Sequence, residues 1–449
     1  MNMYRAWAEP LPRLAADNFC FFLFPSSYRP FVGLFYHIFF NAFGFNPVPF
    51  RLCMLLFLLA NIYLTYAFVR LLTASGETAA VAALLHCYHV HFMPLYRDTG
   101  TCYDIFCFFF YITAFLYYIR IRQQHRLLRP VEQLGFLSLL ICALNAKEIA
   151  VTLPVLIGVY EALYYPPPSR RPRQLISWLA GNGRLMCWGL VINLAFVWGK
   201  VYGANGIGRP PGYVTVVSPT SYIHSLQHDL NEVFFTYGTS VLRDRNLVLF
   251  LLVVLSVAWC LKSASFRFSV LFWLIGVLPV AFIRPRGIYA IYIPLVGLAM
   301  CLAIVLVKGR DLFSSRIFRI PPALAFLLLI FAMASLFYSQ GADKLTVTDI
   351  QAGQINSVII QLRTALPEPR RGARMLFLTD PFDRVPNGGW AIVFVTHLLY
   401  RDNTIELDRL ASMPLKPDAA GMRRYDYIFT VDRERLVLIS QPYVVTPRE

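Results

Sequence analysis

Charged residues are scarce in this chain of 449 residues. They make up 15% of the sequence, whereas a soluble domain contains about 25%, and hydrophobic residues reach 57%. A chain of this composition cannot present most of its surface to water. The shortage of charge therefore excludes an ordinary soluble enzyme and favours a protein whose helices lie in a lipid bilayer.

Acidic residues are the scarcer sign, with 25 Asp and Glu against 41 Lys and Arg, which gives a net charge of +16. Such an excess also occurs in proteins that bind nucleic acids. Here, however, the basic residues occupy short loops between apolar runs and do not form a stripe on one face. We interpret the charge as a signal of membrane topology and expect no nucleic-acid partner.

The nine cysteines are odd in number and lack CxxC spacing, so we expect packing residues and no disulfide framework. A cleavable signal peptide is also not expected, because the first 19 residues mix four charged side chains with scattered apolar ones.

Apolar runs close to the roughly 20 residues that cross a bilayer recur along the chain and predict about ten spans. These spans are placed at 50–71, 77–95, 103–122, 132–147, 148–165, 185–203, 246–262, 268–285, 289–308 and 319–339. The fold class expected is an all-α polytopic membrane domain with a small α/β domain at its C-terminus. Residues 1–49 are expected to form an extracytoplasmic loop with interfacial helices, 50–339 the membrane domain and 340–449 the soluble domain.

Lys and Arg concentrate in the loops that follow the odd-numbered spans, for example in 120–129, 170–184 and 308–319. By the positive-inside rule these loops are cytoplasmic, which places both termini outside. No span precedes residue 50 to carry the first 49 residues across, so an upstream span is expected to be missing. The alternative is that the aromatic segment 31–45 crosses and every later loop changes sides.

From residue 344 onward polar residues return and short strand patterns appear. Residues 345–366 and 390–400 are predicted helices, and 375–379, 405–408, 427–431 and 436–440 are predicted strands. The TDPFD segment at 379–383 follows a strand but has neither a GxGxxG nor a P-loop pattern, so we expect a capped turn there.

Ionisable side chains at membrane depth cost several kcal/mol unless they are paired or face a polar cavity, and each is therefore a functional hypothesis. The candidates at the predicted outer ends of the spans are Tyr28, Arg29, His89, His91, Arg97, Asp104, Lys147, Glu148, Arg284, Arg286 and Tyr289. Arg and Lys at this level are suited to binding a phosphate. Alternatively, Lys147 and Glu148 pair with each other and the arginines reach lipid phosphates.

The histidines of HCYHVH, at 86–91, are spaced by three and two positions, which differs from the i, i+4 pair of a helical zinc site. We therefore expect packing or hydrogen bonding there, and no metal site. The charged side chains of a predicted helix over 221–237 share one face, as in a solvated amphipathic helix.

The order of several short motifs resembles the GT-C superfamily of polyprenyl-phosphate-sugar glycosyltransferases, most closely the O-mannosyltransferase-like branch with the TMTC proteins and their bacterial relatives. The motifs are SSYRPF at 26–31, FGFNPVPFRL at 43–52, HCYHVH at 86–91, YDIFCFFF at 103–110, AKEIAVTLPVLIGVYEAL at 146–163 and RGIYAIYIPLVGL at 286–298. The resemblance covers about residues 26–300. The tail lacks the tetratricopeptide repeats of the TMTC proteins and is similar to the small periplasmic domains of bacterial members.

The resemblance implies transfer of a sugar from a polyprenyl phosphate to a protein or glycan acceptor, on the extracytoplasmic face of the inner membrane and without an obligatory metal or other cofactor. It implies that Arg29, Lys147, Arg284 and Arg286 hold the donor phosphate. The family's catalytic carboxylates, commonly a pair of acidic residues in the first external loop, have no counterpart before SSYRPF. Asp17 is the nearest candidate for the base.

Two other functions stay open. A flippase or transporter of lipid-linked oligosaccharides would also bury charge, although the inverted repeats common in transporters are not seen in this sequence. A protein that has lost catalysis and only binds lipid-linked sugar would keep the phosphate-binding residues without the base.

Overall fold

The computed structural model describes residues 6–19, 29–202, 215–236, 244–260, 262–284, 286–314, 321–382, 391–413, 417–433 and 435–440. The chain separates into two compact units, Met1–Gly341 and Ala342–Glu449, which are described in turn.

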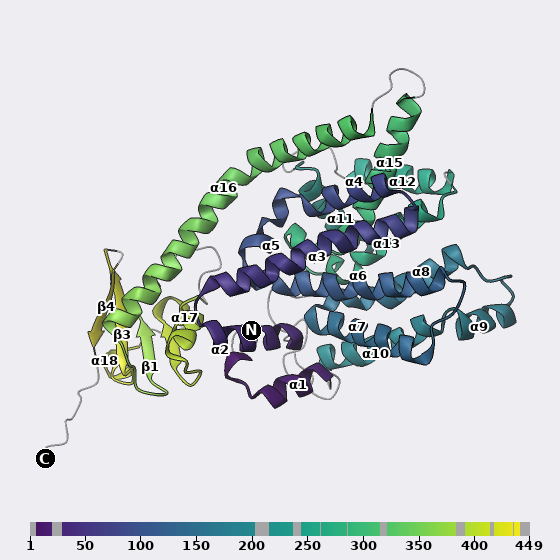
Figure 1. Ribbon diagram of the computed structural model, residues 1–449. Coiled ribbons are helices and arrows are strands. Elements are labelled where there is room, and N and C mark those ends of the chain that lie inside the picture. Colours follow the sequence, from purple (N-terminus) through teal and green to yellow (C-terminus); the bar gives the residue numbers. More distant parts are fainter. Residues whose placement is uncertain are drawn as a thin grey trace, which may run out of the picture. The chain divides into compact units, whose positions relative to one another are not determined.

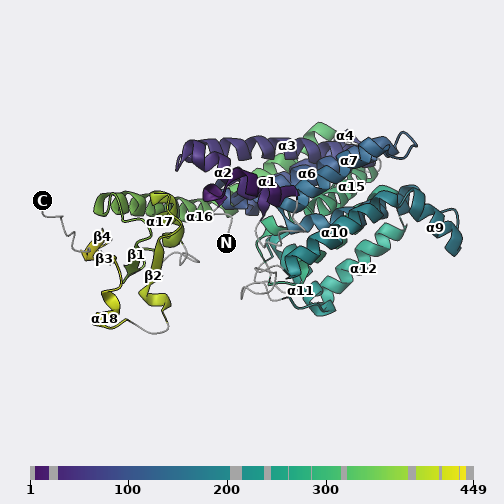
Figure 2. The same ribbon diagram turned by 90° about the horizontal axis from the view of Figure 1, so that it is seen from below.

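The described residues of the first unit form helices and their connections (Figures 1 and 2). They are α1 (Leu11–Phe19), α2 (Pro30–Phe43), α3 (Pro47–Thr73), α4 (Gly76–Cys87), α5 (Met93–Arg97), α6 (Cys102–Arg122), α7 (Pro130–Ala146), α8 (Thr152–Tyr164), α9 (Pro172–Gly181), α10 (Arg184–Tyr202), α11 (Pro219–Val233), α12 (Asp244–Cys260), α13 (Ala264–Gly276), α14 (Leu278–Ala281), α15 (Leu295–Ser314) and the first part of α16 (Pro322–Ala365). Short 3-10 helices join some of them: η2 (Val90–Phe92), η3 (Thr99–Thr101), η4 (Glu148–Val151) and η6 (Ile288–Ile291).

Among the described residues, five helical segments are long and apolar enough to cross a membrane: Pro47–Thr73, Thr99–Arg122, Arg184–Tyr202, Ala264–Ala281 and Pro322–Gln340. Shorter apolar helices in the same unit include Pro30–Phe43 and Pro130–Ala146. The expected helical membrane protein is confirmed at this level. In its described residues, each predicted span overlaps helices of the first unit.

The predicted spans 77–95 and 289–308 are shorter as continuous helices than the hydropathy suggested. In the first of them, α4 ends at Cys87, because the side chain of His89 caps the separate helix η2 and α5 begins at Met93, with Pro94 in its first turn. The predicted span 289–308 begins as α15 at Leu295, after Pro294. Proline has no N–H to donate within a helix, which explains why helices begin at or just after it.

Helix α6 lies at the centre of the first unit. It packs against α3, α7 and α8, and α3, α6 and α7 run alongside one another in both views (Figures 1 and 2). In the most apolar stretch of the segment that contains α6, 72% of the residues are buried. In the corresponding stretch of Pro322–Gln340, 0% of the residues are buried. Phe115 of α6 packs on Phe68 of α3 and on Phe268 and Phe272 of α13, with ring centroids 5.3 to 6.2 Å apart. Such aromatic contacts stabilise the fold more than their buried area alone accounts for.

A buried ion pair joins the C-terminal end of α6 to α8. Arg122 donates from Nε to Oε1 of Glu161 at 2.7 Å and from Nη2 to Oε2 at 2.9 Å. The hydroxyl of Tyr118 donates to the same carboxylate at 2.7 Å. The Glu161 side chain is 0% exposed and that of Arg122 is 5% exposed, so water can replace neither partner.

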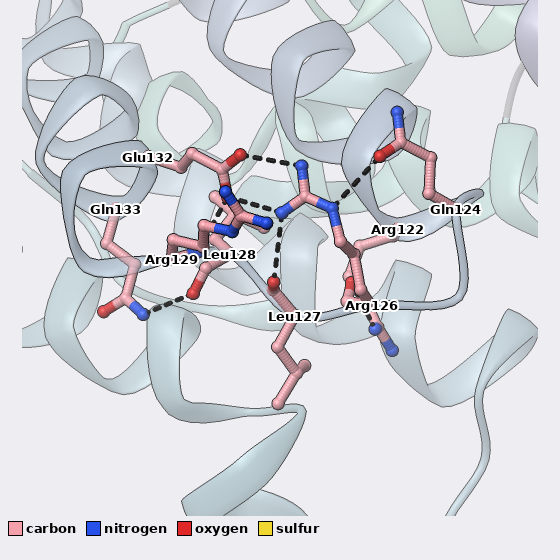
Figure 3. Close-up of polar contacts among 8 residues, drawn as sticks. All are labelled: Arg122, Gln124, Arg126, Leu127, Leu128, Arg129, Glu132 and Gln133. Carbon is pink, nitrogen blue, oxygen red and sulfur yellow. Dashed lines mark hydrogen bonds and ion pairs between the residues drawn. The ribbon is translucent and has the colours of Figure 1, made fainter.

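The loop from α6 to α7 carries a second, more exposed network (Figure 3). Arg126 binds both carboxylate oxygens of Glu132 at 2.6 and 2.7 Å, and its Nε donates to Gln124 at 3.0 Å. Glu132 also accepts from the backbone N–H of Arg129 at 2.7 Å, which satisfies a free donor at the start of α7. These contacts fix the tight turn between two antiparallel helices.

The second unit contains a four-stranded sheet in the order β2-β1-β3-β4. The strands are β1 (Arg374–Phe377), β2 (Glu406–Arg409), β3 (Tyr427–Asp432) and β4 (Arg435–Ser440), with α17 (Ala391–Tyr400) and α18 (Ala419–Met422) between them. Strand β1 pairs in parallel with β2 and β3, and β4 is antiparallel to β3. The four predicted strands fall on these elements.

The core of the second unit is formed by alternate residues of the central strands and by helices. Met375, Phe377 and Phe429 are fully buried and pack with Leu362 of α16 and Ile392 of α17. The helix predicted from residue 345 is the continuation of α16 and does not start a new element.

The expected turn after β1 is also present in part. Asp380 accepts a hydrogen bond from the N–H of Phe382 at 2.8 Å, and residues 383–390 lie outside the described part of the chain.

Replacing Glu161 with Leu would leave Arg122 buried without its carboxylate. We expect the free energy of unfolding to fall by about 3–5 kcal/mol, the usual result of breaking a buried pair from one side. Thermal unfolding of the detergent-solubilised protein measures this. The double variant Arg122→Met, Glu161→Leu should recover much of the loss, and Arg126→Met, at the more exposed pair, should cost no more than about 1 kcal/mol. An undiminished melting temperature in Glu161→Leu would contradict the assignment.

Candidate functional site

A cluster of charged side chains lies at the end of the helix bundle opposite to the Arg122–Glu161 pair. Asp104 stands in the first turn of α6, whose last turn contains Arg122, so the two groups are separated by the length of this helix. Lys147 ends α7 in an extended conformation, and Glu148 begins η4 directly after it. Arg29 is the residue before α2, which starts with Pro30.

Glu148 forms ion pairs with two cations. Arg29 donates to its Oε2 from Nη2 at 2.9 Å and from Nε at 3.2 Å. Nζ of Lys200, in the last turn of α10, lies 3.7 Å from Oε1. The Lys200 side chain is 6% exposed and that of Arg29 is 17% exposed. Both cations are therefore largely withdrawn from water. In the protein interior the dielectric constant is lower, so charge–charge interactions are stronger there.

Lys147 forms an ion pair with Oδ1 of Asp104, and the two side chains are 7% and 3% exposed. The other carboxylate oxygen of Asp104, Oδ2, is buried and has no hydrogen-bond partner among the described residues. A buried acceptor without a partner costs about 1–3 kcal/mol. Oδ2 is thus available to a ligand that brings a donor to this point.

The ring of Tyr103 lies between the two ion pairs. The guanidinium carbon of Arg29 is 3.9 Å from its centroid and Nζ of Lys147 is 5.4 Å from it. Tyr289 belongs to η6, in the connection before α15, and is half-buried. Among the described side chains of this cluster, three cations face two carboxylates: Arg29, Lys147 and Lys200 against Asp104 and Glu148. We call these five residues and Tyr103 the charge cluster.

The backbone around Asp17, the candidate base near the N-terminus, lies near this cluster in space. Asp17 belongs to α1, and the carbonyl of the next residue, Asn18, accepts a hydrogen bond from Nδ2 of Asn145 at 2.6 Å. Asn145 is two residues before Lys147. The side chain of Asp17 and all of Tyr28 lie outside the part of the chain that the structure describes.

The other predicted site residues lie elsewhere in the loops of this end. His91 pairs with Glu232 of α11 at 2.6 Å, and Nε2 of His89 lies 3.0 Å from the carbonyl oxygen of Val233. Arg97 is half-buried at the end of α5. The expected packing role of the HCYHVH histidines is consistent with these contacts.

Arg284 is exposed, and Arg286 is half-buried and accepts through its carbonyl from His228 at 3.1 Å. The described structure therefore joins Arg29 and Lys147 in one cluster and places the other two predicted arginines in the loop before η6.

Lys200 and Tyr103 were not among the residues singled out from the sequence. A lysine near the end of an apolar run is itself a signal, because such residues are rare unless they are paired or functional. Among the described residues, no group of three or more His, Cys, Asp or Glu side chains is arranged to hold a metal ion.

The loop helix α11 differs from the solvated helix that the sequence predicted. Asp229 is 6% exposed, and its Oδ2 has no partner among the described residues. Burial and then the neighbouring charge of Glu232 raise the pKa of Asp229 to about 7. The helix is buried on this side because Leu226 and Leu230 pack inward one turn apart.

Comparisons with models of protein families, with curated proteins and with solved structures found no match to this chain.

The raised pKa of Asp229 makes a pH-dependent contribution to stability. Below the unfolded value, near 3.8, the group is protonated in both states; above about 7 it is ionised in both and bears the full cost of burial. Stability should therefore fall as the pH rises from about 4 to 7. We expect Asp229→Asn to stabilise the protein at pH 8, by up to about 4 kcal/mol, and much less at pH 4.5. Melting temperatures at both pH values test this.

His224 is exposed on the same helix and provides the control. His224→Gln should change the free energy of unfolding by no more than about 0.5 kcal/mol at either pH. A difference between Asp229→Asn and the parent that is equal at pH 4.5 and pH 8 would show that the carboxylate does not titrate in this window.

Proposed function

We propose that the chain is a membrane glycosyltransferase of the GT-C type, which moves a sugar from a polyprenyl-phosphate donor to a protein or glycan acceptor on the extracytoplasmic side. The observation that carries the proposal is the charge cluster. Among the described side chains it gathers three buried cations at the end of an apolar helix bundle, where the phosphate of a membrane-embedded lipid would lie. A phosphate oxygen is the ligand that clustered Arg and Lys donors select.

In this mechanism the cations act on the leaving group. The acceptor hydroxyl attacks the anomeric carbon, the bond from that carbon to the phosphate oxygen breaks, and polyprenyl phosphate leaves with the negative charge. Arg29, Lys147 and Lys200 stabilise that charge in a buried setting, where fixed donors act more strongly than in water. The motif order described above supports the same assignment for Arg29 and Lys147.

The acceptor proton passes to a carboxylate. Asp104 has an oxygen that is buried and without a partner among the described residues, which supports a role as the base. Asp17 remains the second candidate, because α1 is held beside the end of α7.

The proposal includes ten membrane spans, with the charge cluster and the C-terminal unit outside and the Arg122 end inside, in the inner membrane. Basic residues at the Arg122 end support this orientation through the positive-inside rule: Arg120 and Arg122 lie in the last turn of α6, and Arg126 and Arg129 in the connection that follows.

The donor site can be tested without knowledge of the sugar by measuring the binding of a short-chain polyprenyl phosphate to the purified protein. We expect Lys147→Ala and Lys200→Gln each to raise Kd at least about tenfold, because each removes a charged hydrogen bond worth about 1.5–3 kcal/mol. Lys308→Ala is the matched control. Lys308 is exposed near the C-terminal end of α15, away from the charge cluster, so this variant should bind as the parent does.

The base is tested with the same preparations. Asp104→Asn should retain binding of polyprenyl phosphate and lose transfer from a polyprenyl-phosphate hexose to a peptide or glycan acceptor. Unchanged binding in both lysine variants would refute the phosphate site. Binding that depends on the lysines, together with lipid translocation and no transfer in the parent protein, would support a transporter instead.

The orientation predicts which side of the membrane each loop faces. A cysteine introduced as Ser412→Cys, on an exposed residue of the second unit, should react with a membrane-impermeant maleimide in right-side-out vesicles. Ser169→Cys, in the Pro- and Arg-rich loop after α8, should react only after the vesicles are opened. The parent chain gives the background from its own cysteines, and the reverse labelling pattern would show that the orientation is inverted.

A further inference from the structure

An apolar cavity of about 350 Å³ lies between α4, α15 and α16, at the end of the bundle away from the charge cluster. Its walls include Val81 of α4, Leu306 and Val307 of α15, and Ala325, Phe326 and Leu329 of α16. Helices α4 and α15 pack directly on each other, and the cavity is the space that remains where α16 joins them. The volume is in the range of about 300–1,000 Å³ found for small-molecule sites.

An acid–base pair closes one end of this cavity. Nη2 of Arg310 lies 3.0 Å from Oε2 of Glu77, and the second nitrogen contacts Oε1, so the pair is bidentate. Nε of Arg310 also donates to Asp311 at 3.0 Å. One cation and two carboxylates thus lie side by side, with the Arg310 side chain 14% exposed and that of Glu77 31% exposed.

The ends of the adjacent spans give the depth of the cavity. Glu77 follows within four residues of Thr73, where the span Pro47–Thr73 ends, and the span Pro322–Gln340 starts three residues before Ala325. The charged pair therefore lies at the level of the lipid headgroups, and the apolar walls extend from it toward the bilayer interior. Acyl chains, which are the surrounding medium at that depth, fit such walls better than water does.

The charges decide which headgroup fits. Among the described side chains at this end of the cavity, an anionic headgroup would meet two carboxylates and one guanidinium, whereas a headgroup with a phosphate and a primary ammonium offers a partner to each sign. The ammonium has three N–H donors for the carboxylates, which a quaternary amine lacks. We propose that this cavity binds an aminophospholipid of the phosphatidylethanolamine class, with its phosphate at Arg310, its ammonium at Glu77 and Asp311, and one acyl chain in the cavity.

The experiment measures contact between an added indole and brominated lipid, which quenches tryptophan fluorescence at short range. The full chain carrying Phe326→Trp is reconstituted in mixed vesicles, and quenching by brominated phosphatidylethanolamine is compared with brominated phosphatidylcholine after subtraction of the parent signal. Phe331→Trp, whose position on α16 is 74% exposed, reports ordinary surrounding lipid and is the matched control.

We expect about a fivefold preference for phosphatidylethanolamine at position 326, equal to about 1 kcal/mol for one charge near the headgroup layer, and no preference at position 331. Arg310→Gln and Glu77→Gln, each added to Phe326→Trp, should abolish the preference while size-exclusion profiles stay unchanged. Equal preferences at 326 and 331 overturn the proposal, as does a preference that survives both charge substitutions or one that is larger for phosphatidylglycerol. The outcome is independent of sugar transfer.

Discussion

A carboxylate that leaves water for the interior of a helix bundle requires a cation beside it, and helix α6 meets this requirement at both of its ends. Asp104 in its first turn pairs with Lys147 at the end of α7, and Arg122 in its last turn pairs with Glu161 of α8. Removing one partner from a buried pair costs far more than replacing both. The two pairs consequently fix how far α6 can slide along α7 and α8, and the position of Tyr103 follows from that register.

The two ends of the bundle use charge differently. At the α6–α7 loop, Arg126 and Glu132 form a bidentate pair at a partly exposed turn, a setting in which such pairs stabilise little. At the other end the charges are withdrawn from water, cations outnumber carboxylates among the described side chains, and Oδ2 of Asp104 is buried without a described partner. Charge that is buried in a low dielectric is costly to maintain, which is why a buried cluster indicates a ligand more strongly than an exposed surface network does.

Local sequence signals located the helices well and their ends less well. Hydropathy predicted a span over 77–95, but it cannot register that His89 caps a separate short helix or that another begins at Met93, with Pro94 in its first turn. The strands of the second unit were predictable because alternation of apolar residues survives in short segments. The burial of Asp229 was not predicted, because a helix with few apolar residues is expected to be solvated. The packing of Leu226 and Leu230 buries this side of the helix.

The sequence by itself determined that this is a helical protein with segments apolar enough for a membrane, because hydropathy is a sum over neighbouring residues and needs no knowledge of the fold. It also pointed to Arg29, Asp104, Lys147 and Glu148 as individually unusual. Only the tertiary structure decided which of them meet: Arg29 and Glu148 are 119 positions apart, and Asp104 and Lys147 are 43 apart. Ion pairs act over a few ångströms, so their partners are set by how helices pack in space, which is also why Lys200 joined the cluster and Arg284 did not.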